Sequence, residues 1–453
     1  MAEGEDSRPC QCPSRRVRWW HGRSGHEVSM SSGSSRRYNG FRHTRGPKRR
    51  AQGYCANTRS VTSLTIAGRK PWVDLWLVGL GLAAAAGLAV RGNRADYVFD
   101  AGPTIDALAH GRVEYALGHQ PLMGSVSVLL RTPVVALVEL GHGGELLRYR
   151  AGAFPCLVAA GLLGVLLAKA WSNSWRPQIV RPLIVLLAVA NPAVQNAVVF
   201  GHPEEALGAA LCIGAVVLAY RGRVLLAAVA LGLALATKQW AVLAVAPTLV
   251  AAPSGARLRL AIRAGALAVI LTAPLVIGNA AEFIRVSRSA ASGGTTVPNF
   301  DTWWFLTANP LPHWASKATH PAIVVASALI ALLVWSRRGE RSDGLALCAF
   351  IFLVRCVFDP VNNEYYHLPL LLALLAWETL RQRDLPYATL LTAIAMFVTF
   401  RYLFPVAGNA TTSAVYLALT AGLAIYLLHA LRLLPPRFRL RERCSTRVPP
   451  VSP

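Results

Sequence analysis

One stretch, FGHPEEALGAAL at residues 200–211, places a histidine and two adjacent glutamates at the start of an apolar segment. Acidic residues in the first turn of a helix interact favourably with the helix dipole, and Pro203 suits the first helical position. Helix capping explains one glutamate, but it explains less well the combination of His202 with Glu204 and Glu205. Such side chains can also bind a phosphate, sugar hydroxyls or a cationic partner. We therefore interpret the three residues as part of a binding site.

A second set of ionisable residues lies in RADYVFDAGPTIDALAHGRVEYALGHQP, residues 94–121. Asp100 and Asp106 are six positions apart and are separated by a Gly-Pro pair, so a single helix does not bring them to one face. These carboxylates can form a functional cluster, or they can be solvated loop charges. Because the acidic residues lack a tight ligand spacing, we expect no metal ion.

Lys238 lies in the sequence TKQW, between two apolar stretches that are each only about 14 residues long. Its long side chain can extend to the membrane interface. It can equally offer a fixed positive charge to a phosphate group. The sequence leaves both interpretations open.

The stretch FLVRCVFDPVNNEYYHLPLL, residues 352–371, combines charged, amide and aromatic side chains. Arg355 interrupts an otherwise apolar helix four residues before Asp359, with which it can pair. A connector that only reverses the chain does not need the polar and aromatic residues that follow Pro360. Amides and carboxylates bind sugar hydroxyls, and rings pack on the apolar face of a sugar. The candidate sugar-binding residues here are Asn363, Glu364, Tyr366 and His367.

The chain around these residues is strongly apolar. Hydrophobic residues make up 54% of its 453 residues and charged residues 15%, whereas soluble domains carry roughly 25% charged residues. A membrane-spanning helix needs about 20 mainly apolar residues. The pattern predicts an all-α, multi-spanning membrane protein with about twelve transmembrane helices, near residues 72–91, 152–171, 182–199, 204–220, 223–236, 238–252, 262–279, 321–336, 344–359, 365–380, 386–404 and 412–433.

Basic connectors between alternate spans predict the orientation of the chain. Connectors such as RGR and SRRGERSDG belong in the cytoplasm by the positive-inside rule, so twelve spans leave both termini there. The transmembrane domain then covers residues 71–435, with a helical first extracytoplasmic loop at 92–151 and a long outer loop at 280–320. Segment 125–140, which carries Arg131, is expected to be a helix in or beside the outer membrane interface.

Both ends of the chain are basic. Residues 1–70 contain 15 Lys and Arg against 4 Asp and Glu, which favours a disordered cytoplasmic tail over a patch that binds nucleic acid or anionic lipid. Residues 436–453 are expected to form a second cytoplasmic tail. Met30 is an alternative start, and no signal peptide pattern precedes residue 72. The eight cysteines show no zinc-site spacing and no disulfide framework.

The polar stretches carry a resemblance to a known family. The first loop, DYVFDAGPTIDALAHGRVEY, looks like that of the integral-membrane GT-C glycosyltransferases. More particularly, FGHPEEALGAAL, ATKQWAVLAVAP and FDPVNNEYYHLPLLLALL resemble actinobacterial members of the glycosyltransferase 87 type, which use polyprenol-phosphate-mannose. The similarity covers about residues 70–435. The aromatic residue that usually lies four positions after the first Asp is Asp100 here, so Asp96 and Asp100 are alternative candidates for one role.

The resemblance implies inverting transfer of a sugar, mannose by analogy, from a polyprenyl-phosphate donor to a lipid or glycan acceptor on the extracytoplasmic face of the plasma membrane. It implies Asp96 as general base, because its position just past the first span matches the family pattern, with Asp100 as the alternative and Arg94 able to keep Asp96 ionised. No cofactor and no nucleic-acid partner are expected. The residues expected to bind the donor phosphate are Lys238, Arg355 and His202. Those expected to bind the sugar or acceptor are Glu204, Glu205, Asn363, Glu364, Tyr366 and His367.

Two other functions fit the same composition. A transporter or flippase for a lipid-linked sugar or an anionic solute also needs buried cations and outward carboxylates. Such proteins often contain paired halves with interrupted helices in corresponding positions, and ATKQW has no counterpart in the second half of the chain. A non-catalytic assembly partner is the third alternative.

Overall fold

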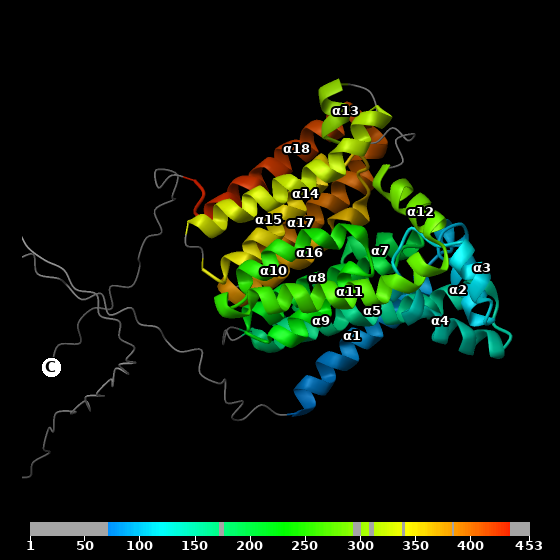
Figure 1. The fold of residues 1–453 in the computed structure, drawn as a ribbon. Helices are drawn as coiled ribbons and strands as arrows, with labels where there is room; N and C mark the ends of the chain where they lie inside the picture. The colour runs from blue at the N-terminus through cyan, green and yellow to red at the C-terminus, as the bar shows by residue number, and fades with distance from the viewer. Residues whose placement is uncertain are drawn as a thin grey trace, which may run out of the picture. The chain divides into compact units, whose positions relative to one another are not determined.

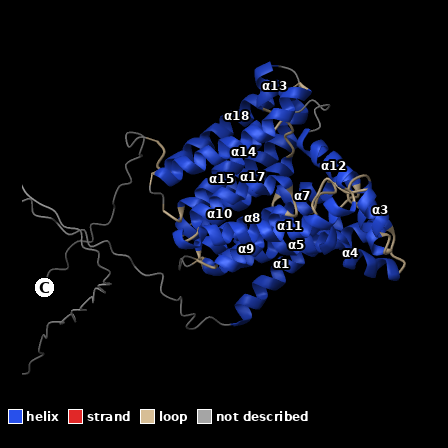
Figure 2. Cartoon of the chain, in the orientation of Figure 1, coloured by secondary structure: helices blue, strands red, loops and turns tan. Residues whose placement is uncertain are grey.

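The computed structural model describes residues 71–171, 176–292, 300–307, 312–337, 340–382 and 385–434. Within these ranges every regular element is helical, as Figure 2 shows. The predicted all-α fold is therefore confirmed for this part of the chain. The two predicted basic tails, 1–70 and 436–453, lie outside the described residues.

The order of the helices can be followed in Figure 1. The first part of the chain forms α1 (Pro71–Arg91), η1 (Ala95–Val98), α2 (Gly102–Ala109), α3 (Val113–Gly118), α4 (Ser125–Leu140), α5 (Glu145–Ala170), α6 (Pro177–Val189) and α7 (Pro192–Val199). The middle part forms α8 (Glu204–Tyr220), α9 (Val224–Leu235), η2 (Gln239–Ala244), α10 (Val245–Ala251), η3 (Ser254–Ala256), α11 (Arg257–Gly278), α12 (Ala280–Ser292) and α13 (Thr302–Thr307). The last part forms α14 (His313–Ser336), α15 (Asp343–Phe358), η4 (Glu364–His367), α16 (Leu368–Trp377), η5 (Glu378–Gln382), α17 (Tyr387–Val398), η6 (Thr399–Leu403) and α18 (Phe404–Ala430).

Six helical segments of the described chain are long and apolar enough to cross a membrane, which supports its assignment as a membrane protein. They are Trp72–Arg91, Glu145–Ala170, Pro177–Val199, Ser254–Gly278, Trp314–Ser336 and Tyr387–Ala430. Shorter apolar helices occupy several of the other predicted spans, including Val224–Leu235 and Gln239–Ala251. By length and composition the described residues therefore supply fewer spanning helices than the twelve that the hydrophobic pattern predicts.

One predicted span and one predicted connector differ in shape from the expectation. The predicted span at 182–199 begins earlier, at Pro177, and breaks between α6 and α7, where the Asn191 side chain accepts a hydrogen bond from Val194 N at 3.1 Å. The predicted connector between 404 and 412 is no loop, because helical residues run through it. Only Gly408 departs from helical geometry, with a φ of 71° that favours glycine.

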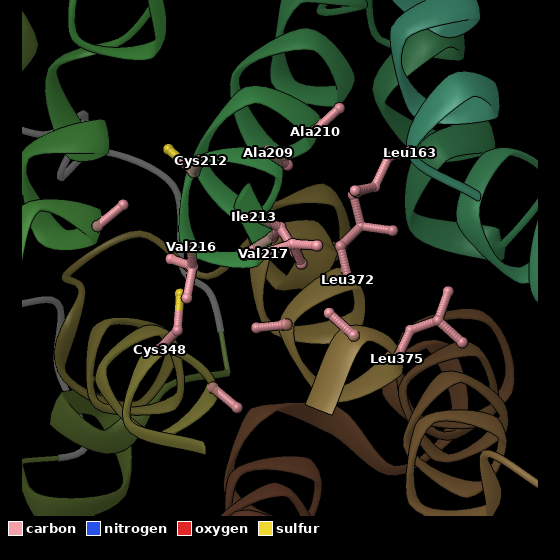
Figure 3. Close-up of a cluster of buried hydrophobic side chains, with 14 of the residues drawn as sticks. Leu163, Ala209, Ala210, Cys212, Ile213, Val216, Val217, Cys348, Leu372 and Leu375 are labelled. Atoms are coloured by element: carbon pink, nitrogen blue, oxygen red, sulfur yellow. The ribbon is translucent and has the colours of Figure 1, made fainter. Parts of the chain in front are cut away.

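Helix α8 is the centre of the hydrophobic core. Nearly all of its residues are buried, and it packs against α5, α9, α10 and α16. Figure 3 shows Ile213 and Val217 of α8 facing Leu372 of α16, with Leu163 of α5 beside them. Small residues such as Ala209 and Ala210 let neighbouring helices approach closely. The packing fixes the position of Glu204 and Glu205, which begin this helix.

The first loop folds into short helices against the start of α5. Helix α4 covers the predicted segment 125–140 and packs on α2 and α5. Its Arg131 is fully buried inside the protein. Helix α2 begins at Gly102 with Pro103 in its first turn, which leaves Asp100 just outside the helix.

Candidate active site

A cavity of about 920 Å³ is lined by segments from distant parts of the sequence. η1 and the residues that follow it, the turn before α8, the turn before η2, α12, α14, α15 and η4 all contribute side chains. Of the residues singled out from the sequence, the cavity lining contains Asp96, Asp100, His202, Glu205, Lys238, Arg355 and Tyr366. A volume of this size accommodates a sugar and a phosphate group together.

His202 connects the exposed carboxylate of Asp96 to a buried carboxylate. Its Nε2 lies 3.0 Å from Asp96 Oδ2, and its Nδ1 lies 3.1 Å from Glu204 Oε1. The Asp96 side chain is 62% exposed, whereas that of Glu204 is fully buried. The Asp96 carboxylate, the His202 imidazole and the Glu204 carboxylate are therefore connected in series, from the cavity into the core.

Gly201 allows the turn before α8 to approach the backbone of η1 closely. Gly201 has a φ of 92°, a left-handed conformation that costs a side-chain-bearing residue energy. A Cβ atom at this position would also lie 2.6 Å from the backbone nitrogen of Tyr97. The adjacent Phe200 carbonyl accepts the backbone N–H of Asp96 at 3.2 Å. Close approach of the two backbones thus sets the contact between Asp96 and His202.

Two cations neutralise Glu204 in the core. The ammonium of Lys238 lies 3.0 Å from Glu204 Oε1, and the guanidinium of Arg131 lies 3.5 Å from Glu204 Oε2. Lys238 also lies 3.1 Å from Glu205 Oε1, while Trp240 Nε1 donates to Glu205 Oε2 at 3.0 Å. The chain is extended at Lys238, between α9 and η2, and this break brings the amine to the start of α8. Lys238 is therefore already paired with two carboxylates.

Arg355 lines the cavity and has an unused hydrogen-bond donor among the described residues. Its guanidinium lies between two rings, 5.0 Å from the centroid of Trp240 and 4.8 Å from that of Tyr366. Its Nε is 3.6 Å from Asp359 Oδ2, which His320 of α14 also approaches at 3.6 Å. Its buried Nη1 has no hydrogen-bond partner among the described residues. A buried, unpartnered guanidinium N–H favours an anionic ligand.

Asp96 and Asp100 differ in their surroundings. Asp100 Oδ1 accepts the backbone N–H of Leu122 at 2.8 Å, so it also holds the first loop in place. Burial raises the pKa of the Asp100 carboxyl above its ordinary value, although the nearby charge of Lys238 opposes this rise. Arg94 forms an ion pair with Glu145. The expectation that Arg94 serves Asp96 is therefore corrected, because His202 is the partner that Asp96 contacts.

Glu204 and three residues predicted to bind sugar lie outside the cavity lining. The amide of Asn363 donates to the hydroxyl of Tyr365 at 3.2 Å, and His367 Nε2 lies 2.9 Å from the hydroxyl of Tyr416. Glu364 is buried and pairs with Arg401 at 3.5 Å. Burial raises the pKa of Glu364 to about 7, with Arg401 opposing the rise. These residues support the segment that presents Tyr365 and Tyr366 to the cavity.

Several residues of the site carry no recognisable signal in the sequence. Arg131 lies 73 positions from Glu204, and the cavity residue His320 lies in a helix that reads only as a span. Trp240 is the exception, since it belongs to the TKQW stretch around Lys238. Further lining residues form the Tyr115–His119 stack, with ring centroids 4.0 Å apart, and the Glu282–Arg285 ion pair at 2.6 Å.

No group of three or more His, Cys, Asp or Glu side chains suited to a metal ion occurs in the described ranges. The four cysteines that lie within the helices, Cys156, Cys212, Cys348 and Cys356, are buried and free. The polar side chains that line the cavity include carboxylates, cations, imidazoles, amides and hydroxyls. Such a set can transfer a proton and bind a phosphate.

Comparisons of the chain with protein-family models, with curated proteins and with solved structures find no match.

Proposed function

We propose that this chain is a membrane-embedded glycosyltransferase of the GT-C type, close to the glycosyltransferase 87 group. In this proposal it transfers a sugar, mannose by analogy, from a polyprenyl-phosphate donor to a hydroxyl of a lipid or glycan acceptor, with inversion. The observation that carries it is a single cavity lined by both Asp96, whose carboxylate is exposed, and Arg355, whose buried Nη1 has no hydrogen-bond partner among the described residues.

Asp96 acts as the general base. It accepts the proton of the acceptor hydroxyl while the hydroxyl oxygen attacks the anomeric carbon of the donor. The bond between that carbon and the phosphate oxygen breaks, and the polyprenyl phosphate leaves with both bonding electrons. The products are a glycoside of inverted configuration, a polyprenyl phosphate and a proton on Asp96.

Arg355 binds the phosphate and stabilises the charge that grows on the leaving oxygen. A guanidinium presents several N–H donors in one plane, and its Nη1 is free of other partners among the described residues. Lys238 faces the same cavity but is shared between two carboxylates. We assign to Lys238 a smaller electrostatic contribution than to Arg355. His202 is likewise occupied at both ring nitrogens and does not bind phosphate in this mechanism.

One wall of the cavity is apolar and suits the lipid part of the donor. Val242 and Leu243 come from η2, and Ile323 and Val324 come from α14. Val242 and Val324 remain partly exposed. A nucleotide-activated donor would present a polar nucleoside to this wall, whereas a polyprenyl chain gains free energy by contacting it.

The topology belongs to the same proposal. Twelve spans with both termini in the cytoplasm place the cavity on the extracytoplasmic face of the plasma membrane. Several of the spans are then short helices, such as α9, α15 and α16, that pack inside the bundle. To test this orientation, a cysteine is introduced into the first loop of the protein in intact cells. We expect it to react with a membrane-impermeant maleimide added outside the cells.

The direct test is transfer of labelled mannose from polyprenyl-phosphate-mannose by membranes that contain the protein. Asp96→Asn should abolish transfer, since an amide cannot accept the proton. Asp106→Asn is the matched control, because Asp106 lies in the same loop, pairs with Arg148 at 3.7 Å and does not line the cavity. Full activity of Asp96→Asn would contradict the assignment. Uptake of the lipid-linked sugar into proteoliposomes without a new glycosidic bond would favour a transporter.

A further inference from the structure

His202 is bracketed by two carboxylates, one at each ring nitrogen. The distances are 3.0 Å from Nε2 to Asp96 Oδ2 and 3.1 Å from Nδ1 to Glu204 Oε1. The imidazole is 14% exposed, so water has little access to replace either contact. Carboxylates only accept hydrogen bonds when ionised.

The charge of Glu204 follows from its own partners. It is fully buried and contacts the cations Lys238 and Arg131. A buried carboxylate between two cations is held in its ionised form. A neutral imidazole has one N–H and would direct a lone pair at one of the two carboxylates, whereas an imidazolium donates to both.

We propose that His202 is an imidazolium that positions Asp96 as the catalytic base. This inference rests on the proposed function, because it assigns Asp96 a proton to accept. It makes His202 a positioning residue that acts through Asp96 and touches no substrate.

The charged and titratable groups that face His202 come from each neighbouring element. Asp96 of η1 and Asp100 after it approach from the first loop, Glu204 from α8, Lys238 from the turn before η2, and Tyr365 from η4. Burial opposes a charge on the ring, but the hydrogen bond and charge of Glu204 raise the pKa of His202 above its ordinary value, against the opposing charge of Lys238. The imidazolium is therefore present below this raised pKa and is lost as the pH rises through it.

The reaction step balances without a change at His202. The proton of the acceptor hydroxyl moves to the free oxygen of Asp96, Oδ1, while the imidazolium N–H continues to donate to Oδ2. The proton then leaves Asp96 for water once the glycoside has departed. His202 thus holds one orientation and one charge through the cycle.

The pH–rate profile of His202→Gln tests the inference. Glutamine can donate a hydrogen bond but carries no positive charge. We expect kcat to fall about 10- to 100-fold with the donor KM unchanged. We also expect the alkaline limb that reports loss of the imidazolium to vanish. His110→Gln is the control, because His110 pairs with Glu139 and does not line the cavity.

A second measurement does not depend on turnover. Solid-state ¹⁵N spectra of histidine-labelled protein in lipid, with His202→Gln used for assignment, report the protonation of both ring nitrogens. We expect two protonated nitrogens for His202 at pH 6.5, since its pKa is raised above the ordinary value. A neutral imidazole of His202 at this pH would overturn the inference about His202 but not the proposed function. The same holds if the wild-type protein is active and His202→Gln has the same pH–rate profile. Absence of any transfer by the wild type would instead contradict the proposed function, while the spectra would still test the charge of His202.

Discussion

The ammonium of Lys238 lies 3.1 Å from Glu205 Oε1 and joins the turn before η2 to the first turn of α8. The same ammonium reaches Glu204 at 3.0 Å. Two acidic side chains that precede an apolar helix are thus held inside the protein by one lysine. The contact explains how the chain can bury Glu204 and Glu205 next to the cavity.

Replacement of Lys238 by methionine should destabilise the protein. It leaves buried carboxylates with one cation fewer, and loss of one partner from a buried ion pair costs about 3–5 kcal/mol. We expect a lower unfolding temperature in detergent, measured by tryptophan fluorescence. The double variant Lys238→Met with Glu205→Gln should recover part of this loss, because it removes one charge as well. Equal unfolding temperatures of the single and double variants would contradict the pairing.

Arg355→Lys should weaken donor binding. Lysine keeps the charge but loses the planar group between Trp240 and Tyr366, a contact worth about 1–2 kcal/mol when shielded from water. We expect the KM for the polyprenyl-phosphate donor to rise roughly 5- to 30-fold. Arg381→Lys provides the comparison, since Arg381 pairs with Asp343 at 2.8 Å outside the cavity. An unchanged donor KM in Arg355→Lys would exclude the stacked guanidinium as the phosphate ligand.

Glu364→Gln should stabilise the protein in a pH-dependent way. Burial raises the pKa of Glu364 to about 7, so the folded state binds a proton that the unfolded state releases near its ordinary value. Wild-type stability therefore falls as the pH rises from about 4.5 to about 7, and the variant avoids this loss. The difference in unfolding temperature should be absent at pH 4.5 and largest above pH 7. Glu340→Gln, which alters an exposed carboxylate paired with Arg432, is the control. A difference that does not vary with pH would show that the charge of Glu364 is not its source.

Gly201→Ala should damage both stability and transfer. The φ of 92° and the close backbone of Tyr97 leave no room for a Cβ atom, and strain of this kind costs about 1–3 kcal/mol. The substitution should also separate Asp96 from His202 and lower kcat. Gly265→Ala on α11 is the matched control, since a Cβ there meets no atom within 4 Å. Wild-type stability in Gly201→Ala would show that the two segments can move apart without loss.

The sequence is sufficient to predict the helical class and to single out several of the residues that line the cavity. Hydrophobic segments and basic connectors predict the helical membrane class. Polar residues at the ends of apolar segments indicate the candidate site. The structure brings Asp96, His202, Lys238 and Arg355 to one cavity, although the first and the last of them are 259 positions apart in the chain.

The parts that could not be predicted depend on contacts between distant helices. Nothing near Arg131 in sequence indicates that it pairs with Glu204, since its neighbours resemble an amphipathic surface helix. Likewise, the short turn after Asp359 carries six polar or aromatic side chains in a row, residues 362–367, and only packing decides which of them face the cavity. Asn363, Glu364 and His367 turn toward the protein, while Tyr365 and Tyr366 line the space.

The burial of α8 among its neighbours limits which residues of the cavity can change in sequence. Its first turn carries the acidic pair, so a change in the tilt of this helix would disturb the charged floor of the cavity and the packing of the whole bundle at once. Under the proposed function, variation in substrate preference is therefore expected at the edge of the cavity, where α3 and α12 carry exposed residues such as Tyr115 and Arg285. Relatives that accept different acceptors should differ there and keep the floor intact.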